Sequence, residues 1–223
     1  MYRNQIVDKE KTYIGYVGNP NTFTRWYCKD NKAHAFCGMF QDYVVKHDMK
    51  LDWFDDCSNF AYVPTIVEWA KKKKWYDTNF KNAKQGDLVI YNWYPEKKNH
   101  YSHIGMVYEA KSSGIVSIEG NTTNSLGKSN CVAKKSRNKK YIAGIVHLPY
   151  DEQFNLTRLL KKGCKGDDVK ELQKTLGGLS VDGIFGDKTL VKVKAYQKKH
   201  KLSVDGKVGK NTAHALGWLW KNK

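Results

Sequence analysis

The chain has 223 residues, of which 40% are hydrophobic and 27% charged, and its 39 Lys and Arg against 22 Asp and Glu give a formal net charge of +17. This apolar content is enough for a folded core and excludes wholesale disorder. No apolar run approaches the ~20 residues of a membrane-spanning helix, and the first ten residues, MYRNQIVDKE, lack the apolar stretch of a secretory signal peptide.

Positive charge is spread along the whole chain. Residues 1–150 carry 23 basic and 14 acidic side chains, and residues 151–223 carry 16 and 8. Nucleic acid, an anionic membrane and an anionic cell wall are all suitable partners for such a charge. Neither half is a detached basic tail, and the dense run Lys71–Lys74 is typical of a solvated helix end. The even distribution of charge favours long-range attraction to a large polyanion over a defined binding surface for double-stranded nucleic acid.

The first 150 residues are predicted to be mixed α+β. Apolar residues at helical spacing predict a helix from Cys37 to about His47, and a second helix is expected over residues 64–74. Four strands are then predicted, over residues 87–93, 103–108, 114–118 and 142–148. Helices followed by a run of short strands are typical of an antiparallel sheet packed on helices.

Five cysteines are widely spaced, at Cys28, Cys37, Cys57, Cys131 and Cys164. Their number is odd and no CxxC pair occurs, so neither a structural zinc site nor a disulfide framework is predicted. Cys37 differs from the others because it opens a predicted helix, within AFCGMFQDYVVK. Helix N-terminal amides lower the pKa of a thiol and can hold an oxyanion, which makes Cys37 a candidate nucleophile.

A cysteine nucleophile needs a base, and His103 is the best placed of the seven histidines. It begins the apolar strand HIGMVYE, and the next strand ends in Glu119, Gly120 and Asn121. Two adjacent antiparallel strands would present His103 and Glu119 side by side. If the strand continues, Glu119 and Asn121 share a face, and either could orient the imidazole.

Two other interpretations of these residues stay open. His103 could be a surface histidine at a strand edge, with Glu119 an ordinary strand-end carboxylate. Alternatively, His100 and His103 could bind zinc together with a carboxylate, although no third ligand has a convincing motif.

The composition of the chain changes near residues 150–155, after which Lys, Gly and Asp become frequent. We therefore predict one domain over residues 1–150, a linker over residues 151–155 and a second domain over residues 156–223. In the second domain VDGIFGDKTLVKV, residues 181–193, lines up with VDGKVGKNTAHAL, residues 204–216, and each copy is an Asp-Gly turn followed by a helix start.

An earlier helix of the second domain is expected to begin at Asp167 or Asp168, which could cap it. These elements predict a small all-α unit of three helices without a catalytic constellation, so its default role is binding. Trp218 and Trp220 follow the last helix and are expected to pack against its end rather than to stack on sugars.

The first domain resembles the CHAP family, the cysteine- and histidine-dependent amidohydrolases/peptidases that cut peptidoglycan, over residues 8–150. Its segments GYVGNPNTFTRWY, AFCGMF, QGDLVIYNW, HIGMVYE and IEGNT stand in the family's order. The resemblance implies a papain-like α+β fold, with Cys37 as nucleophile, His103 as general base and then acid, and Glu119 as the orienting residue. Asn121 matches a polar position that the family often uses beside the acid.

The resemblance implies no required cofactor. Phe36 stands where the family usually has tryptophan, a difference of packing more than of chemistry. Some members bind calcium through closely spaced aspartates before the nucleophile. The corresponding stretch here, YCKDNKAHAF, holds only Asp30, so no calcium is expected there, while bound calcium elsewhere stays open.

The second domain is similar to the small three-helix peptidoglycan-binding domain, through GCKGDDVKELQKTL, VDGIFGDKTLVKV and LSVDGKVG. The two resemblances together imply a modular cell-wall lytic enzyme of the bacteriophage endolysin type. Such an enzyme has peptidoglycan and anionic wall polymers as partners, and neither nucleic acid binding nor membrane insertion is expected. It would stay in the host cytoplasm until released to the wall. No oligomeric state is predicted.

The bond that is cut stays open at this point. An N-acetylmuramoyl-L-alanine amidase is expected slightly more than a peptidoglycan endopeptidase with the same residues. A bacterial autolysin or a virion-associated lysin are alternatives to an endolysin. A non-catalytic wall-binding protein and a basic nucleic-acid binder are the alternatives from other classes.

Overall fold

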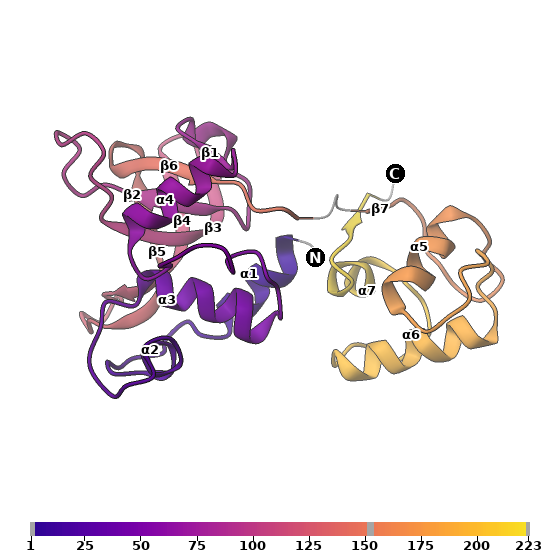
Figure 1. Cartoon of the computed structure of the whole chain (residues 1–223). Coiled ribbons are helices and arrows are strands. Elements are labelled where there is room, and N and C mark those ends of the chain that lie inside the picture. The colour runs from indigo at the N-terminus through magenta and orange to yellow at the C-terminus, as the bar shows by residue number, and fades with distance from the viewer. Residues whose placement is uncertain (1–2, 151–153, 222–223) are drawn as a thin grey trace. The chain divides into compact units, whose positions relative to one another are not determined.

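The computed structural model describes residues 3–150 and 154–221 (Figure 1). Contacts divide the chain into two compact units, residues 6–150, and residues 151–223 together with residues 1–5. Within the described ranges no helix is long and apolar enough to span a bilayer. Residues 151–153 of the predicted linker lie outside the described residues, and Asn155 begins the short strand β7 (Asn155–Leu156).

The N-terminal unit is built on a six-stranded antiparallel sheet in the order β1-β6-β2-β3-β4-β5 (Figure 1). Its strands are β1 (Tyr76–Asp77), β2 (Leu88–Tyr91), β3 (His103–Lys111), β4 (Gly114–Thr122), β5 (Cys131–Asn138) and β6 (Ile142–Val146). Its helical elements are α1 (Arg3–Lys11), α2 (Thr22–Cys28), α3 (Cys37–Asp42), the π-helix η1 (Tyr43–Asp48), α4 (Val63–Lys72) and the 3-10 turns η2 (Phe80–Asn82) and η3 (Lys139–Tyr141). The predicted α+β class, an antiparallel sheet packed with helices, is confirmed.

The central strand β2 is buried on both faces of the sheet. Leu88 and Ile90 point into the main core, which also takes side chains from α1 to α4 and includes the start of α3. Val89 and Tyr91 point the other way, into a smaller apolar cluster. Helix α3 packs against β3 and β4, and this contact places its first residue beside the strands that carry His103 and Glu119.

Several elements of the N-terminal unit differ from their predictions. The helix predicted from Cys37 to His47 exists, but from Tyr43 onward it is a π-helix. Strand β5 was not predicted because, after its first three residues, its sequence is dominated by exposed polar side chains, as edge strands often are. The short helices α1 and α2 were not predicted either, because neither has a long apolar stripe.

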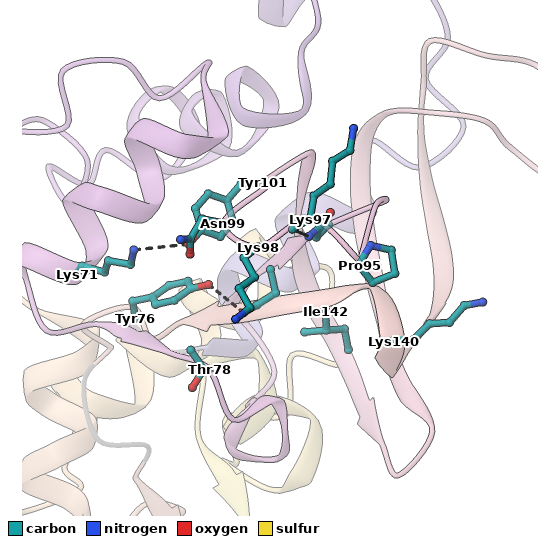
Figure 2. A pocket seen from close by; sticks show the side chains of 12 residues that line it. Lys71, Tyr76, Thr78, Pro95, Lys97, Lys98, Asn99, Tyr101, Lys140 and Ile142 are labelled. Atoms are coloured by element: carbon teal, nitrogen blue, oxygen red, sulfur yellow. Dashed lines mark hydrogen bonds between the residues drawn. The ribbon is translucent and has the colours of Figure 1, made fainter.

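A cavity of about 300 Å³ opens in the N-terminal unit where α4, β1 and β6 meet the loop between β2 and β3 (Figure 2). Lysine and tyrosine side chains contribute much of its lining, including Lys71, Tyr76, Lys98 and Tyr101. Among the residues that the structure describes, no aspartate or glutamate lines it. The cavity is therefore a basic pocket with aromatic walls.

The C-terminal unit contains the three predicted helices, α5 (Asp167–Leu176), α6 (Asp187–Lys199) and α7 (Lys210–Ala215). Asp167 is the first residue of α5, but the cap position is Gly166, so the predicted aspartate cap is wrong. The chain ends in β8 (Leu219–Trp220), which pairs in parallel with β7 and was not predicted. Trp218, 1% exposed, lies in the core of this unit, as the packing interpretation expects.

Two buried glutamines explain the internal repeat. Nε2 of Gln173 donates to the Asp182 carboxylate at 2.7 Å, and its Oε1 accepts from the Gly183 amide at 2.9 Å. Gln197 makes the same pair of bonds one repeat later, to Asp205 at 2.8 Å and from the Gly206 amide at 2.9 Å. The recurring Asp-Gly turn is therefore closed in each copy by a glutamine from the preceding helix.

Candidate active site

Cys37 is the first residue of α3 and is only 5% exposed. The preceding residue, Phe36, makes no side-chain capping bond but is fully buried and stacks on Phe23, with ring centroids 5.8 Å apart. Apolar packing therefore sets the start of this helix. The backbone amides of Gly38 and Ile104 lower the pKa of the Cys37 thiol.

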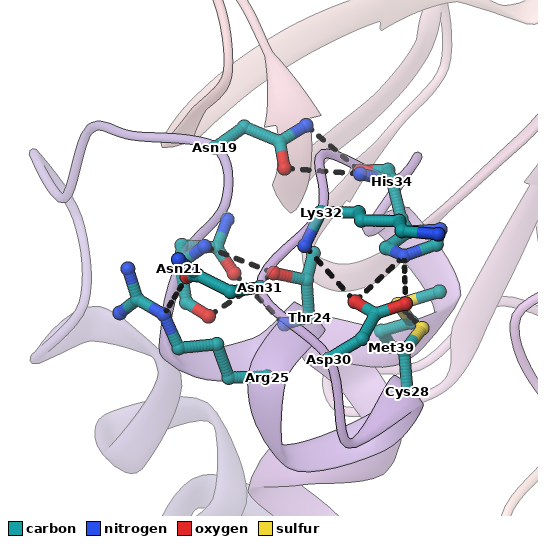
Figure 3. A network of polar contacts seen from close by, with 10 residues as sticks. All are labelled: Asn19, Asn21, Thr24, Arg25, Cys28, Asp30, Asn31, Lys32, His34 and Met39. Carbon is teal, nitrogen blue, oxygen red and sulfur yellow. Dashed lines mark hydrogen bonds and ion pairs between the residues drawn. The ribbon is translucent and has the colours of Figure 1, made fainter.

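The loop before Cys37 is held by a network of polar contacts (Figure 3). Asn19 brackets the backbone of His34: its Nδ2 donates to the His34 carbonyl at 2.8 Å, and its Oδ1 accepts from the His34 amide at 3.1 Å. The His34 Nε2 lies 3.0 Å from the Asp30 carboxylate, which also accepts from the Lys32 amide. Asp30 therefore stabilises the loop that precedes Cys37.

His103 begins β3, and Glu119 lies near the end of the neighbouring strand β4. The His103 Nε2 is 3.0 Å from Oε2 of Glu119, and the two residues are 6% and 0% exposed. His103 and the Cys37 thiol lie close enough for each to shift the pKa of the other. Since Nε2 is bonded to Glu119, Nδ1 is the nitrogen left to face the sulfur. The structure thus joins three of the predicted residues in one chain of contacts.

The thiol and the imidazole shift each other's protonation. Burial raises the pKa of Cys37, but the hydrogen bond and charge of His103 and the two amides outweigh it and bring the pKa below its ordinary value. Burial lowers the pKa of His103, but its contacts with Cys37 and Glu119 dominate and raise it to about 9. Both shifts favour a thiolate beside an imidazolium, which is the reactive form of a cysteine nucleophile.

Sequence reasoning missed two residues that hold Glu119. Arg137 on β5 donates from Nε to Oε1 at 2.9 Å and from Nη2 to Oε2 at 2.5 Å. The Ser117 hydroxyl donates to Oε1 at 2.7 Å. Burial raises the pKa of Glu119, yet Arg137 and His103 overcome it and lower the pKa to about 2. Glu119 therefore stays ionised although it is fully buried.

An aromatic wall lies on the other side of this ion pair. The Arg137 guanidinium sits 4.8 Å from the centroid of the Trp93 ring, and Trp93 is also 5.6 Å from the His103 ring. Trp93 lies parallel to Tyr91, whose hydroxyl is 2.8 Å from that of Ser117. No single-sequence signal points to Arg137, because β5 reads as a polar segment and only its pairing with β4 brings the guanidinium to Glu119.

Two glycines make room for these contacts. A Cβ at Gly105 would lie 2.8 Å from Cγ of Glu119, so any other residue there would displace the carboxylate. A Cβ at Gly120 would lie 2.7 Å from Cβ of Phe40 and would push α3 away from β4. The close approach of the helix to the sheet depends on both positions.

Two further candidate site residues, Asn121 and His100, make no hydrogen bond to the cluster among the residues that the structure describes. Asn121 has a left-handed backbone, with φ of 55°, at an irregularity of the β4–β5 pairing. Strand β4 continues to Thr122, but the left-handed residue breaks its regular alternation. The orienting role of Asn121 stays a prediction. In the described part of the chain no hydrogen bond joins its side chain to the cluster. His100 bonds Ser102 at 3.0 Å instead. Among residues 3–150 and 154–221, no group of three or more His, Cys, Asp or Glu could hold a metal ion.

Residues 165–216 match the model of a family described as "Putative peptidoglycan binding domain". The match spans all three helices of the C-terminal unit. The N-acetylmuramoyl-L-alanine amidase CwlL of Bacillus licheniformis is 42% identical over 72 residues, which make up 29% of this chain and 20% of the relative. The chain thus matches about a fifth of the length of this curated relative.

Two solved structures show slight likeness to the chain. A fused Zn-dependent amidase/peptidase/peptidoglycan-binding domain-containing protein from Clostridium acetobutylicum is 32% identical, covers 29% of this chain and 31% of its own, and has a TM-score of 0.27. A peptidoglycan-binding protein from Clostridioides difficile is 21% identical, covers 67% and 84%, and also has a TM-score of 0.27.

Proposed function

We propose that this chain is a peptidoglycan hydrolase that cleaves an amide bond with Cys37 as nucleophile. The observation that carries the proposal is the buried chain of contacts from the Cys37 thiol through His103 to Glu119. Such an arrangement supplies a nucleophile, a base and a group that orients the base. The family match of residues 165–216 supports the wall as the place where the enzyme works.

The reaction follows from the protonation of the pair. The Cys37 thiolate attacks the carbonyl carbon of the scissile amide and forms the C–S bond, while amides at the start of α3 stabilise the oxyanion. The His103 imidazolium gives its Nδ1 proton to the leaving nitrogen, and the C–N bond breaks. Water then gives a proton to His103 and attacks the thioester, and the C–S bond breaks to restore the thiolate.

Glu119 remains an anion throughout this cycle. It holds the imidazole by Nε2, so that Nδ1 stays directed at Cys37, and it stabilises the imidazolium that the first step requires. The C-terminal unit would hold the enzyme on its polymer and raise the local concentration of cleavable bonds.

Among the bonds of the wall we propose the one between N-acetylmuramic acid and L-alanine, the amidase reaction, with a peptide-bond endopeptidase as the alternative. The identity of 42% to an N-acetylmuramoyl-L-alanine amidase over 72 residues supports the first. We further propose an endolysin that acts from inside a host cell. An autolysin or a virion-associated lysin would use the same residues.

The proposal is tested by digesting purified Gram-positive peptidoglycan with wild type, Cys37→Ala and Cys28→Ala. Cys28 is a matched control because it is a half-buried cysteine whose pKa burial raises. We expect wild type and Cys28→Ala to release products and Cys37→Ala to release none, with products identified by mass spectrometry.

The product masses separate the possibilities. Glycan free of stem peptides identifies an amidase, and glycan with shortened peptides identifies an endopeptidase. Digestion by Cys37→Ala at the wild-type rate contradicts the cysteine mechanism. Loss of that digestion in a chelator would then favour a zinc enzyme.

A further inference from the structure

The basic pocket of the N-terminal unit takes no part in the proposed catalytic steps. It is lined by residues of α4, β1, η3, β6 and the loop from Asn92 to Tyr101, and four of its lining residues are lysines, Lys71, Lys97, Lys98 and Lys140. In Figure 2, Lys71 and Lys98 point toward the space around Tyr76 and Tyr101, whereas Lys97 and Lys140 extend outward from its rim. The pocket thus has a cationic centre and a cationic edge.

Of these four cations, Lys71 alone has a carboxylate partner among the described residues. Lys71 pairs with Glu68 at 2.9 Å and lies 5.7 Å from the ring centroids of Tyr76 and Tyr101. Lys97 and Lys140 approach only the rings of Tyr94 and Tyr141, and within residues 3–150 and 154–221 no carboxylate pairs with Lys97, Lys98 or Lys140.

This excess of positive charge surrounds a cavity large enough for a small anionic group. Uncompensated charges that converge on one concave site focus the field there and attract anions.

The pocket lies at the same end of the sheet as the candidate active site. Tyr91 of β2 pairs with His103 on one side and with Ile142, which lines the pocket, on the other. Adjacent strands are about 4.8 Å apart, so the backbones of Ile142 and His103 are separated by roughly 10 Å. A polymer held in the pocket would therefore run close to the Cys37–His103 pair.

We propose that this pocket binds a phosphate group of an anionic wall polymer and so holds phosphate-bearing wall beside the active site. The inference rests on the proposed function, since it assigns a second recognition element to the same hydrolase. Lysine ammonium groups act as point charges that suit phosphate, and Thr78 and Asn99 add hydroxyl and amide donors.

The test compares two double variants of the full chain that lose the same charge. Lys97→Ser with Lys98→Ser changes the pocket. Lys81→Ser with Lys84→Ser is the control, because both lysines are exposed, lie in the same unit and do not line the pocket. Retention and cleavage are measured on wall that carries its phosphodiester polymers and on wall stripped of them with hydrofluoric acid.

We expect the pocket variant to bind and cleave phosphate-bearing wall about twofold to tenfold less well than the control variant, the range for two exposed charge contacts. On stripped wall the two variants should be equal. In the wild-type chain, sn-glycerol 3-phosphate should shift the amide NMR signals of Asn99, Tyr101 and Ala143, while acetate at the same concentration should not.

Three outcomes would overturn the phosphate assignment. Equal losses in both variants mean general attraction by net charge. An equal defect of the pocket variant on stripped wall means that the recognised group is a carboxylate of peptidoglycan itself. Shifts with acetate as strong as with sn-glycerol 3-phosphate mean an unselective anion site. A wild type that cleaves neither wall contradicts the proposed hydrolase, whereas retention and NMR still report on the pocket.

Discussion

Glu119 is the residue on which the charges of the candidate active site converge. Its two oxygens accept from His103, Ser117 and, twice, from Arg137, and it is fully buried. A buried carboxylate with this many donors remains ionised and cannot rotate freely. Its role in the proposed mechanism is therefore to fix the imidazole and to keep it protonated.

The first prediction at this scale is a pH profile. With the pKa of His103 raised to about 9, kcat/KM should fall on the alkaline side as pH rises through about 9, because the imidazolium loses its proton. The apparent pKa values belong to the coupled pair of Cys37 and His103. In Glu119→Gln the carboxylate charge is lost, so the alkaline limb should move to lower pH. An unmoved limb in that variant would contradict the role of Glu119.

The second prediction concerns Arg137 as a positioning residue. Arg137→Met keeps a side chain that can pack on Trp93 but removes both bonds to Glu119. We expect kcat to fall about tenfold to a hundredfold, since charge-assisted bonds of this kind contribute about 1.5–3 kcal/mol. The alkaline limb should move to higher pH, because the cation that offsets the Glu119 charge near His103 is gone.

Arg158→Met is the matched control for this change. Arg158 forms a similar two-bond pair with Asp168, at 2.6 and 2.8 Å, in the C-terminal unit. Its loss should leave the pH profile in place. If Arg137→Met lowers activity without moving the profile, its role is only to support the fold.

At the scale of elements, helix α3 and the Asp-Gly repeat show how much structure a sequence pattern can predict. The helix that starts at Cys37 was predicted by its apolar stripe, but its continuation as a π-helix from Tyr43 depends on packing in the core. The Asp-Gly repeat can be recognised in the sequence. The structure shows that each turn is closed by a glutamine side chain from the helix before it.

This arrangement predicts local consequences. Gln197→Leu should lower the free energy of unfolding of the C-terminal unit by about 1–3 kcal/mol, the cost of leaving buried partners such as the Gly206 amide unsatisfied. Hydrogen exchange should quicken most at Gly206. Gln173→Leu should instead expose Gly183, and identical exchange patterns in the two variants would contradict separate turn closures.

At the scale of the whole molecule, the net charge of +17 is carried by both units. Retention of the full chain on purified wall should therefore weaken as ionic strength rises from about 0.05 to about 0.5 M, because the screening length shrinks over this range. A sedimentation assay with wall fragments measures it. Retention that does not change with salt would show that uncharged contacts dominate.

The sequence by itself determined the fold class, the three C-terminal helices and the residues Cys37, His103 and Glu119 as candidates. Periodicity, turn residues and the start of a helix are local properties, so they can be read from neighbouring letters. The tertiary structure alone decided the partners of Glu119, the room left by Gly105, the left-handed backbone of Asn121 and the basic pocket. Each of these depends on which strands pair and in what register, and on which loop closes beside them, and no local pattern specifies that.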